Sequence, residues 1–498
     1  MSGNTGMKLE DVIKSTQIKS VTGSLNDHAI ERVDYDSRQV KPGSLFCALS
    51  GKEADGNEFI PKALENGASA ILSEKSFPAN TSVPWLQVDN ARAAMATCAA
   101  ELYENPSHEM PVVGVTGTNG KTTTAFLIHY LMEASLRRAG MLGTVHYQIA
   151  DEVQVASRTT PESTDVHRML REMRDADCRA AVMEVASHGL AQHRVGGVKF
   201  AAGVFTNLTQ DHLDYHETMD AYFDAKKRLF QQMAAQDDEP TMIVNFDDSY
   251  GKRLLKAPIG GVKKLTFGQS AGCDFRVAGI KPDLNGTQFQ LYIKGRQLLV
   301  KIPLIGTFNV YNCLAALAAA QSINLNVREA ISNLENAPQV PGRMEAVDGD
   351  RRINYRVFVD YAHTPDALEN ALKTARDLRP NRLITVFGCG GDRDVRKRPL
   401  MGKAADTASD LSILTLDNPR TEDPAKILRD TESGMNGNYK VIEDRREAIE
   451  FAISLAGERD IVVIAGKGHE DYQEINGVKH DFDDRKVAGE CIRARSED

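Results

Sequence analysis

The stretch Gly114-Val-Thr-Gly117-Thr-Asn-Gly120-Lys121-Thr122-Thr123 ends an apolar run and opens a helical pattern that extends to about Arg138. This order of strand, glycine turn and helix indicates a phosphate-binding loop, because backbone N–H groups at a helix start can surround phosphate oxygens. In such a loop Lys121 reaches the β- and γ-phosphates and the Thr122 hydroxyl contacts Mg²⁺. The standard first glycine is replaced by Val115, so only the GxxGKT core is present. The alternative is a glycine turn followed by an exposed lysine.

Strand and helix patterns alternate downstream of this loop. A helical pattern, MDAYFDAKKRLFQQMA at 219–234, lies between the apolar runs at 201–207 and 241–246. Alternation of this kind predicts a parallel sheet. From 263 to 304 the residues alternate as in hairpins, which predicts an antiparallel edge. The buried-strand candidates are AAVMEV at 180–185, AAGVFTN at 201–207 and TMIVNF at 241–246.

The length of 498 residues predicts about three domains. NPSHEMP at 105–111 and VPGR at 340–343 are the candidate boundaries. We therefore expect an α/β protein with a small N-terminal α/β domain at 1–105. A central domain at 106–342 carries the mostly parallel, P-loop-type sheet. A Rossmann-like α/β domain at 343–498 follows, because strand and helix patterns repeat there several times.

Composition narrows the classes of function. Lysine and arginine number 60 against 69 acidic residues, a net charge of −9, which disfavours a nucleic-acid-binding surface. No apolar run approaches the roughly 18 residues of a membrane span, and the N-terminus has no signal-peptide layout. The seven cysteines form no CxxC pair, so we expect a chain in the reducing cytoplasm without disulfides or a structural zinc site.

Acidic and histidine side chains follow two of the predicted strands. Glu184 ends the run at 180–185, where a carboxylate commonly assists a phosphate loop by holding magnesium. The alternative is a solvated glutamate. The stretch TNLTQDHLDYH at 206–216 contains Asp211, His212, Asp214 and His216, and with His188 and His193 it could be mistaken for a zinc hydrolase site. Since no HExxH is present, we favour a polar loop beside the phosphates.

Nine motifs occur in one order along the chain: TGTNGKTTT, MEVASHGL, TNLTQDHLDYH, FNVYN, GRME, DYAHTPDAL, FGCGGDRD, DNPRTEDP and AGKGHEDYQ. Together they resemble the Mur ligases of peptidoglycan synthesis, and specifically the members that add 2,6-diaminopimelate. The resemblance covers essentially the whole chain. It implies an ATP-dependent, ADP-forming acid–amino-acid ligase that phosphorylates a substrate carboxylate to an acyl phosphate, which an amine then attacks.

The resemblance implies roles for individual residues around ATP. Lys121, His212 and Lys226 would be catalytic, with Lys226 carbamylated and Lys227 as the competing candidate. Thr122, Glu184, His212 and Lys226 would hold Mg²⁺. The ATP-binding residues would be Gly117, Thr118, Asn119, Gly120, Lys121, Thr122, Thr123, Asn309, Asn312, Arg343, Asp360 and His363.

The other two substrates are also implied by the resemblance. UDP-N-acetylmuramoyl-L-alanyl-D-glutamate would contact Ser37, Arg38, Thr159, Thr160, Ser187, Gln192 and Arg194. Meso-diaminopimelate would contact Arg393, Asp417, Asn418, Pro419, Arg420, Gly466 and Glu470. The three diaminopimelate motifs follow predicted parallel strands, where open α/β sheets bind ligands.

The DNPR motif is typical of the diaminopimelate-adding enzymes. Arg420 can grip the carboxylate that distinguishes diaminopimelate from lysine, and Glu470 can take the ammonium group. Lysine should then be rejected by about 10⁴-fold. The alternative is that DNPR is a polar turn before a helix that starts at Asp423-Pro424.

Three rival functions remain at this point. The first is the same ligase adding L-lysine, and the second is a folylpolyglutamate synthetase, which lacks an N-terminal nucleotide-sugar domain. The third is a P-loop NTPase switch, which should carry an NKxD motif that the chain lacks. We expect a monomer without nucleic-acid or membrane partners.

Overall fold

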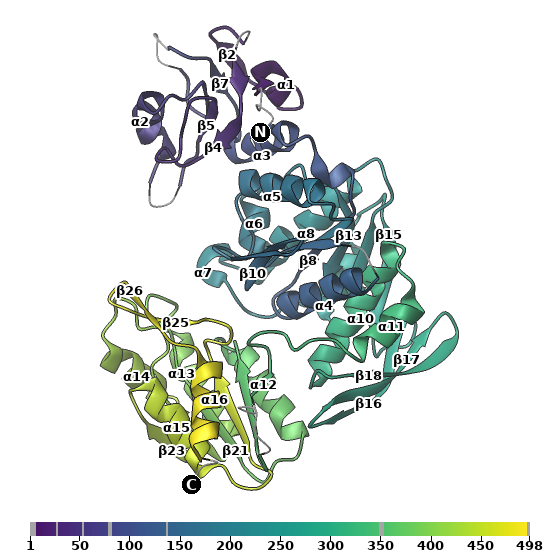
Figure 1. The fold of residues 1–498 in the computed structure, drawn as a ribbon, viewed down its shortest axis with the longest axis vertical. Coiled ribbons are helices and arrows are strands. Elements are labelled where there is room, and N and C mark those ends of the chain that lie inside the picture. The colour runs from purple at the N-terminus through teal and green to yellow at the C-terminus, as the bar shows by residue number, and fades with distance from the viewer. Residues whose placement is uncertain are drawn as a thin grey trace.

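The computed structural model describes residues 6–25, 28–51, 54–77, 82–135, 138–347 and 353–495. It consists of three α/β bodies arranged along the long axis, each built on its own sheet (Figure 1). The predicted three-part α/β fold is therefore confirmed. Among the described residues, no helix is both long and apolar enough to cross a membrane.

The N-terminal body is a five-stranded sheet in the order β2-β7-β6-β5-β4. The strands from β7 to β4 are parallel, and β2 joins antiparallel. Helices α1 (Leu9–Ile13) and α3 (Ala91–Leu102) pack on one face, while α2 (Ile60–Glu65) packs on the other. The strands are β2 (Ser20–Thr22), β4 (Arg32–Asp34), β5 (Ser44–Ala48), β6 (Ala70–Ser73) and β7 (Trp85–Gln87).

The central body is an eleven-stranded sheet in the order β11-β10-β9-β12-β8-β13-β14-β15-β16-β17-β18. The strands from β9 to β16 are parallel, and the predicted hairpins β16–β17–β18 form an antiparallel edge. The parallel strands are β8 (Val112–Thr116), β9 (Ala139–Leu142), β12 (Ala180–Glu184), β13 (Phe200–Phe205), β14 (Thr241–Asn245) and β15 (Lys263–Gly268). The hairpin strands are β16 (Phe275–Asp283), β17 (Gly286–Ile293) and β18 (Arg296–Ile302).

Helices cover both faces of this sheet. Helices α4 (Lys121–Ala134), α10 (Thr307–Ser322) and α11 (Val327–Leu334) share one apolar core with it. Helices α5 (Ser163–Asp175) and α8 (Met219–Ala234) share the core on the opposite face (Figure 1). Because the strands are buried on both sides, they are continuous apolar runs, as parallel strands require.

The opposite edge of the central sheet also is antiparallel, which sequence patterns did not predict. Strands β10 (His146–Ile149) and β11 (Glu152–Val155) form a hairpin beside β9. The turn places Ala150 at φ 53°, where glycine or asparagine is the usual turn signal. All four residues of β11 are exposed, so the strand has no buried face.

The C-terminal body is a six-stranded sheet in the order β19-β20-β24-β21-β22-β23, parallel except for β19. One face is covered by α12 (Pro365–Asp377), α13 (Lys397–Ala408) and α14 (Pro424–Glu432), and the other by α15 (Arg445–Leu455) and α16 (Asp484–Arg495). The strands are β19 (Glu345–Val347), β20 (Arg356–Asp360), β21 (Leu383–Phe387), β22 (Leu411–Leu414), β23 (Tyr439–Val441) and β24 (Ile461–Ala465), and β25 (Tyr472–Ile475) with β26 (Val478–Asp481) form a separate hairpin.

A fully buried ion pair joins α15 to α16. Arg445 donates from Nε and Nη2 to the two carboxylate oxygens of Asp484 at 2.8 and 2.7 Å, and both side chains are 0% exposed. Nη2 also donates to the carbonyl of Ala465 at the end of β24. The pair therefore anchors the end of the strand that precedes the AGKGHE motif.

We expect Asp484→Asn to lower the free energy of unfolding by about 3–5 kcal/mol, because it leaves a buried cation without its counter-charge. The matched control is Arg446→Gln, which breaks an exposed pair between Arg446 and Glu490 on the same two helices. That change should cost less than about 1 kcal/mol. Urea unfolding followed by circular dichroism measures both, and equal costs would contradict the prediction.

Candidate active site

Two glycines shape the loop between β8 and α4. Gly117 has φ 149° and Gly120 has φ 83°, conformations that side chains rarely adopt. A Cβ atom at Gly117 would lie 1.9 Å from Oγ1 of Thr206, and one at Gly120 would lie 2.4 Å from Oδ1 of Asn312. Val115 is buried inside β8, so the standard first glycine is not needed here.

Lys121 folds back over this loop. Its Nζ donates to the carbonyl oxygens of Gly117 at 3.1 Å and Thr118 at 2.8 Å. Burial lowers the pKa of Lys121, and the nearby carboxylates of Glu184 and Asp211 oppose that shift. The ammonium group is therefore held at the mouth of the loop, where a phosphate would meet it.

Glu184 lies at the carboxyl end of β12, directly beside the loop. Its Oε2 accepts from the Thr122 hydroxyl at 3.0 Å and the Thr144 hydroxyl at 3.1 Å, and its Oε1 accepts from the Thr144 backbone N–H at 2.8 Å. Arg343 donates from Nη2 to the same Thr122 hydroxyl at 3.1 Å. A cation from the segment entering the C-terminal body thus reaches the phosphate loop.

Lys226 is buried in the apolar face of α8, with 1% of its surface exposed. Its Nζ donates to the carbonyl of Gly117 at 2.7 Å and lies 4.6 Å from the ring centre of Tyr222. Burial, and then the charge of Lys121, lower the pKa of Lys226 well below its usual value. Lys227 faces away and pairs with Asp224 at 2.5 Å. Of the two competing lysines, only Lys226 contacts the loop.

Helix periodicity contained a signal for this burial. The buried positions 222, 226, 229 and 233 follow the i, i+4, i+7 spacing of a core-facing stripe. A lysine in such a stripe is rarely buried unless it has a function or a partner.

A cluster of histidine and tyrosine rings lies beside Lys226. His188 packs edge-on against His212 with ring centres 4.8 Å apart, and His216 stacks on Tyr222 at 5.2 Å. His216 Nε2 also lies 2.9 Å from the hydroxyl of Ser187. Burial lowers the pKa of His212 and of His216 to about 4, so both rings are neutral near pH 7. In the described part of the chain, no three His, Cys, Asp or Glu side chains group as a metal site.

His216 belongs to the polar loop that we expect beside the phosphates, whereas the sequence patterns do not indicate Tyr222 as a site residue. Tyr222 connects the cluster to the phosphate loop, since its hydroxyl lies 3.1 Å from that of Thr118. The spacing of His212 and His216 in DHLDYH, one helical turn apart, was the available signal.

The remaining predicted ATP residues have partners inside the protein. Asn309 donates to the carbonyl of Ile305 at 2.9 Å, and Asn312 donates to Asn309 at 3.1 Å. The carboxylate of Asp360 accepts from the backbone N–H of Met344 at 2.7 Å, and burial raises its pKa. Their side chains therefore stabilise the site through hydrogen bonds within the protein.

His363 belongs to the C-terminal body, on the side that faces the phosphate loop. Its side chain is exposed, and Nδ1 is 2.8 Å from the carbonyl of Tyr361. Near it, Asp366 accepts from Asn119 at 3.0 Å, a contact between the central and C-terminal bodies that sequence patterns did not reveal. Thr123 is buried in the first turn of α4.

The residues predicted for the nucleotide-sugar substrate divide into two groups. Ser37 and Arg38 follow β4 in the N-terminal body, where Arg38 is exposed and paired with Asp36 at 2.7 Å. Gln192 and Arg194 follow α6 (Ser187–Ala191) in the central body, where Arg194 donates to Gln192 at 2.7 Å. Thr159, Thr160 and Ser187 also belong to the central group.

Thr159 and Thr160 differ in how their hydroxyls are used. Thr159 lies 3.1 Å from the Thr144 hydroxyl, beside Glu184. Thr160 is 1% exposed, donates to the carbonyl of Glu184 at 2.8 Å and accepts from the N–H of Ala186 at 2.9 Å. Its hydroxyl is therefore occupied within the protein.

Three arginines converge on one buried carboxylate between the N-terminal and central bodies. Glu162 lies 3.3 Å from Arg92, 2.7 Å from Arg158 and 3.1 Å from Arg194. Three cations around one anion leave an excess of positive charge, which suits an anionic ligand. Arg92 and Arg158 were not predicted, because Arg92 belongs to a helix of a different body.

The motifs predicted for the amino acid meet at the carboxyl ends of β21, β22 and β24. Asn418 donates to Oε2 of Glu470 at 2.8 Å, joining DNPR to AGKGHE. Arg420 has φ 52° and donates to the carbonyl of Gly391 at 2.7 Å, which joins DNPR to FGCGGDRD. Arg393 is exposed in that loop, and Pro419 precedes Arg420. As predicted, Asp423 caps α14 at Pro424.

Asp417 lies against the AGKGHE loop. A Cβ atom at Gly466, whose φ is 117°, would lie 2.4 Å from the Asp417 carboxylate. Burial and Asp417 raise the pKa of Glu470. The DNPR and AGKGHE motifs thus bring the carboxylates of Asp417 and Glu470 close to each other.

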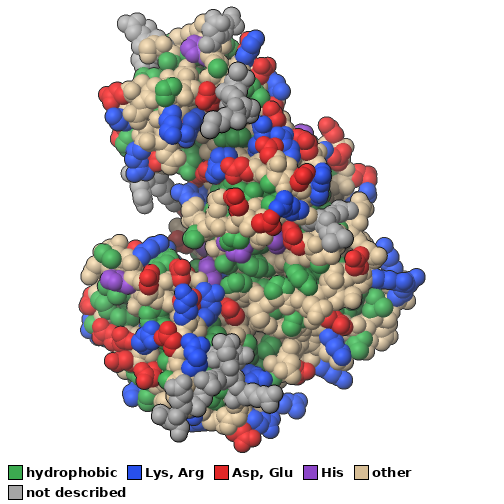
Figure 2. Space-filling model, viewed as in Figure 1, with side chains coloured by type: hydrophobic (Ala, Val, Ile, Leu, Met, Phe, Trp, Pro, Cys, Tyr) green, Lys and Arg blue, Asp and Glu red, His purple; other side chains and the backbone are tan. Residues whose placement is uncertain are grey.

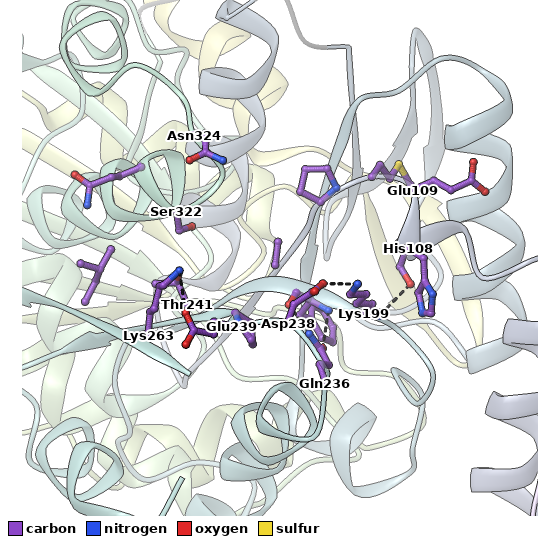
Figure 3. A pocket seen from close by; sticks show the side chains of 18 residues that line it. His108, Glu109, Lys199, Gln236, Asp238, Glu239, Thr241, Lys263, Ser322 and Asn324 are labelled. Atoms are coloured by element: carbon purple, nitrogen blue, oxygen red, sulfur yellow. Dashed lines mark hydrogen bonds and ion pairs between the residues drawn. The ribbon is translucent and has the colours of Figure 1, made fainter. Parts of the chain in front are cut away.

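A cavity of 540 Å³ lies away from these motifs, at the opposite end of the central sheet. It is lined by residues at the amino ends of β13, β14 and β15, with Lys199 paired to Asp238 and Lys263 paired to Glu239 (Figure 3). By contrast, the space-filling view is hollowed on the side where the three bodies face one another, and histidines gather there (Figure 2). Ligands of open α/β sheets bind at carboxyl ends of strands, so the motif-bearing side is the candidate site.

Comparison with known proteins defines the class. Residues 115–320 match the Mur ligase middle domain, 342–468 match the Mur ligase glutamate ligase domain, and 29–103 match the model described as Mur ligase family, catalytic domain. The chain belongs to the Mur ligase family, and it is an ATP-dependent amide ligase.

Individual relatives have more specific names than the family models. A UDP-N-acetylmuramoyl-L-alanyl-D-glutamate–2,6-diaminopimelate ligase of Clostridium botulinum is 41% identical over 98% of this chain and 100% of its own length. A solved structure of a ligase with that name is 35% identical, covers 99% of both chains and has a TM-score of 0.71. The MurF ligase of Thermotoga maritima in complex with ADP has a TM-score of 0.64 at 19% identity over 94% of this chain and 100% of that one, a likeness of fold.

Proposed function

We propose that this chain joins meso-2,6-diaminopimelate to UDP-N-acetylmuramoyl-L-alanyl-D-glutamate with conversion of ATP to ADP and phosphate. The observation that carries the proposal is the convergence of Lys121, Lys226 and Arg343 on one phosphate loop. Relatives named for this activity match nearly the whole chain.

The chemistry requires activation of a poor electrophile. A carboxylate oxygen of the nucleotide-sugar substrate attacks the γ-phosphorus, ADP leaves, and an acyl phosphate forms. The amine of diaminopimelate then attacks the acyl carbon, and phosphate leaves as the amide forms and the amine loses a proton. Phosphoryl transfer needs positioning and charge neutralisation. In the proposal, Lys121 and Arg343 provide the positive charge and the loop N–H groups orient the phosphates.

The donor set beside the loop fits Mg²⁺, which prefers oxygen ligands and retains part of its water shell. The Thr122 hydroxyl and the Glu184 carboxylate offer oxygen atoms next to the loop. His212, neutral near pH 7, adds a third candidate ligand. When bound, Mg²⁺ would neutralise charge on the phosphates. We propose these three residues, with Lys226 as a carbamate, as its ligands.

Carbamylation of Lys226 is supported by its surroundings. A neutral amine adds to the carbon of CO₂ and releases a proton, so a lysine whose pKa is strongly lowered is suited to this reaction. The product is an anion, which would relieve the repulsion between Lys226 and Lys121 and could bind a divalent cation.

The other substrates are assigned by charge. Arg194, with Arg92 and Arg158, would face the anionic groups of the nucleotide-sugar dipeptide, and Ser37 and Arg38 would face its nucleotide end. Arg420 and Arg393 would bind carboxylates of diaminopimelate, and Glu470 with Asp417 would bind an ammonium group.

Phosphate release tests the proposal. The full chain is incubated with ATP, Mg²⁺, the UDP-linked dipeptide and one amino acid at a time. Meso-diaminopimelate should support turnover, and lysine should be about 10⁴-fold poorer in kcat/KM. Equal turnover with lysine would overturn the substrate assignment. Hydrolysis without dipeptide or amino acid would instead favour an NTPase switch.

A further inference from the structure

A lysine with no exposed surface lies beneath the amino-acid motifs. Lys467 is 0% exposed, and its Nζ donates to Oδ1 of Asn418 at 3.2 Å and to Oε2 of Glu470 at 3.4 Å. It also donates to the carbonyl of Tyr472. A buried ammonium group is costly unless it is paired and hydrogen-bonded. These partners account for its burial.

The three partners of Lys467 come from two segments, the loop after β22 and the stretch that runs from β24 into β25. Asn418 follows β22, Glu470 lies in the loop after β24, and Tyr472 begins β25. Asn418 closes the network, because its Nδ2 donates to Oε2 of Glu470 at 2.8 Å and its Oδ1 accepts from the N–H of Glu474 at 2.9 Å. The carboxylate of Glu470 is thereby held from two sides.

The Glu470 carboxylate needs a nearby cation to stay ionised. Burial and the Asp417 carboxylate favour the neutral form of Glu470, while Lys467 favours the ionised form. Neutral Glu470 could no longer attract an ammonium group by charge. Lys467 itself has no exposed surface, so it cannot touch a ligand bound at these motifs.

We propose that Lys467 is a positioning residue for the amino-acid substrate, holding Glu470 and Asn418 where an ammonium group of diaminopimelate binds. The inference rests on the proposed function. It assigns the fixed geometry of the ammonium subsite to a buried residue that cannot itself touch the ligand.

Lys467→Met removes the charge while keeping the length of the side chain. KM for diaminopimelate should rise about 10–100-fold, the loss expected when charge-assisted hydrogen bonds are removed. KM for ATP and for the UDP-linked dipeptide should stay within about twofold. Lys467→Gln keeps hydrogen-bonding capacity without charge, so its KM for diaminopimelate should lie between those of the wild type and Lys467→Met. It also provides a second variant if Lys467→Met does not fold.

The matched control is Lys479→Met on β26, an exposed lysine over the ring of Tyr472, which should leave every KM unchanged. A uniform fall in kcat with unaltered KM for diaminopimelate, or equal rises in all three KM values, would show that Lys467 is only structural. Absence of diaminopimelate-dependent turnover in the wild-type chain would refute the proposed function itself, a distinguishable result.

The pH dependence gives a readout that a structural role would not move. The groups facing Glu470 are Lys467, Asp417, Tyr361, Tyr472 and Arg445. The raised pKa of Glu470 means that diaminopimelate binding is lost as pH falls through it. Without Lys467 that pKa rises further, so KM should begin to climb at a higher pH in Lys467→Met than in the wild type. Superimposable KM profiles would contradict the proposal.

Discussion

Lys226→Ala is expected to be nearly inactive, with kcat reduced by about 10³-fold or more, as when a preorganised charge beside a transferring phosphoryl group is removed. The buried Nζ donates to the loop carbonyl of Gly117, and the side chain is 1% exposed. If the working form is a carbamate, a short carboxylic acid such as acetate should restore part of the activity, because it returns an anion to the space that alanine opens.

Lys227→Ala is the matched control for this result. Lys227 is the next residue on α8 but pairs with Asp224 on the outer face. The Lys227→Ala variant should keep near wild-type kcat and show no response to acetate. Incorporation of isotope-labelled bicarbonate into the wild-type chain, and its absence from Lys226→Ala, would report the modification directly. Normal activity of Lys226→Ala would refute its assignment.

Arg420→Met should lower kcat/KM for diaminopimelate by about 10²–10³-fold, because a bidentate carboxylate contact would be lost. The backbone of Arg420 is held by β25 and the turn that follows it: its N–H donates to the carbonyl of Glu474 at 3.0 Å, and its carbonyl accepts from the N–H of Asn476 at 2.7 Å. This anchoring supports the left-handed conformation of Arg420 and fixes where its side chain starts.

The selectivity ratio is the decisive measurement for Arg420→Met. Lysine lacks the carboxylate that Arg420 would bind, so its poor turnover should change little and the ratio between the two amino acids should collapse. Arg429→Met is the control, since Arg429 is 67% exposed on α14 and pairs only weakly with Asp423 at 3.6 Å. An unchanged ratio in Arg420→Met would place carboxylate recognition elsewhere.

Local patterns were sufficient for much of the fold. The strand–loop–helix around Lys121 and the helix at 219–234 appear where expected. The hairpins lie within the predicted range of 263–304 but begin at Phe275, because β15 (Lys263–Gly268) is parallel to both of its neighbours. Each depends on a short-range rule: apolar alternation, helical spacing or a turn residue. The hairpin at 146–155 was missed for the same reason, because its turn uses Ala150 in place of a glycine.

Sequence alone determined the three-part α/β fold, the phosphate loop and the motifs at strand ends. Only the tertiary structure decided that the Lys226 amine meets the Gly117 carbonyl, that Arg92 joins Arg158 and Arg194 around Glu162, and that Lys467 contacts Asn418 of the DNPR motif. The physical reason is that these contacts join elements far apart in the chain. Periodicity predicts which face of an element is buried, but the packing of sheets and helices selects the partner it meets.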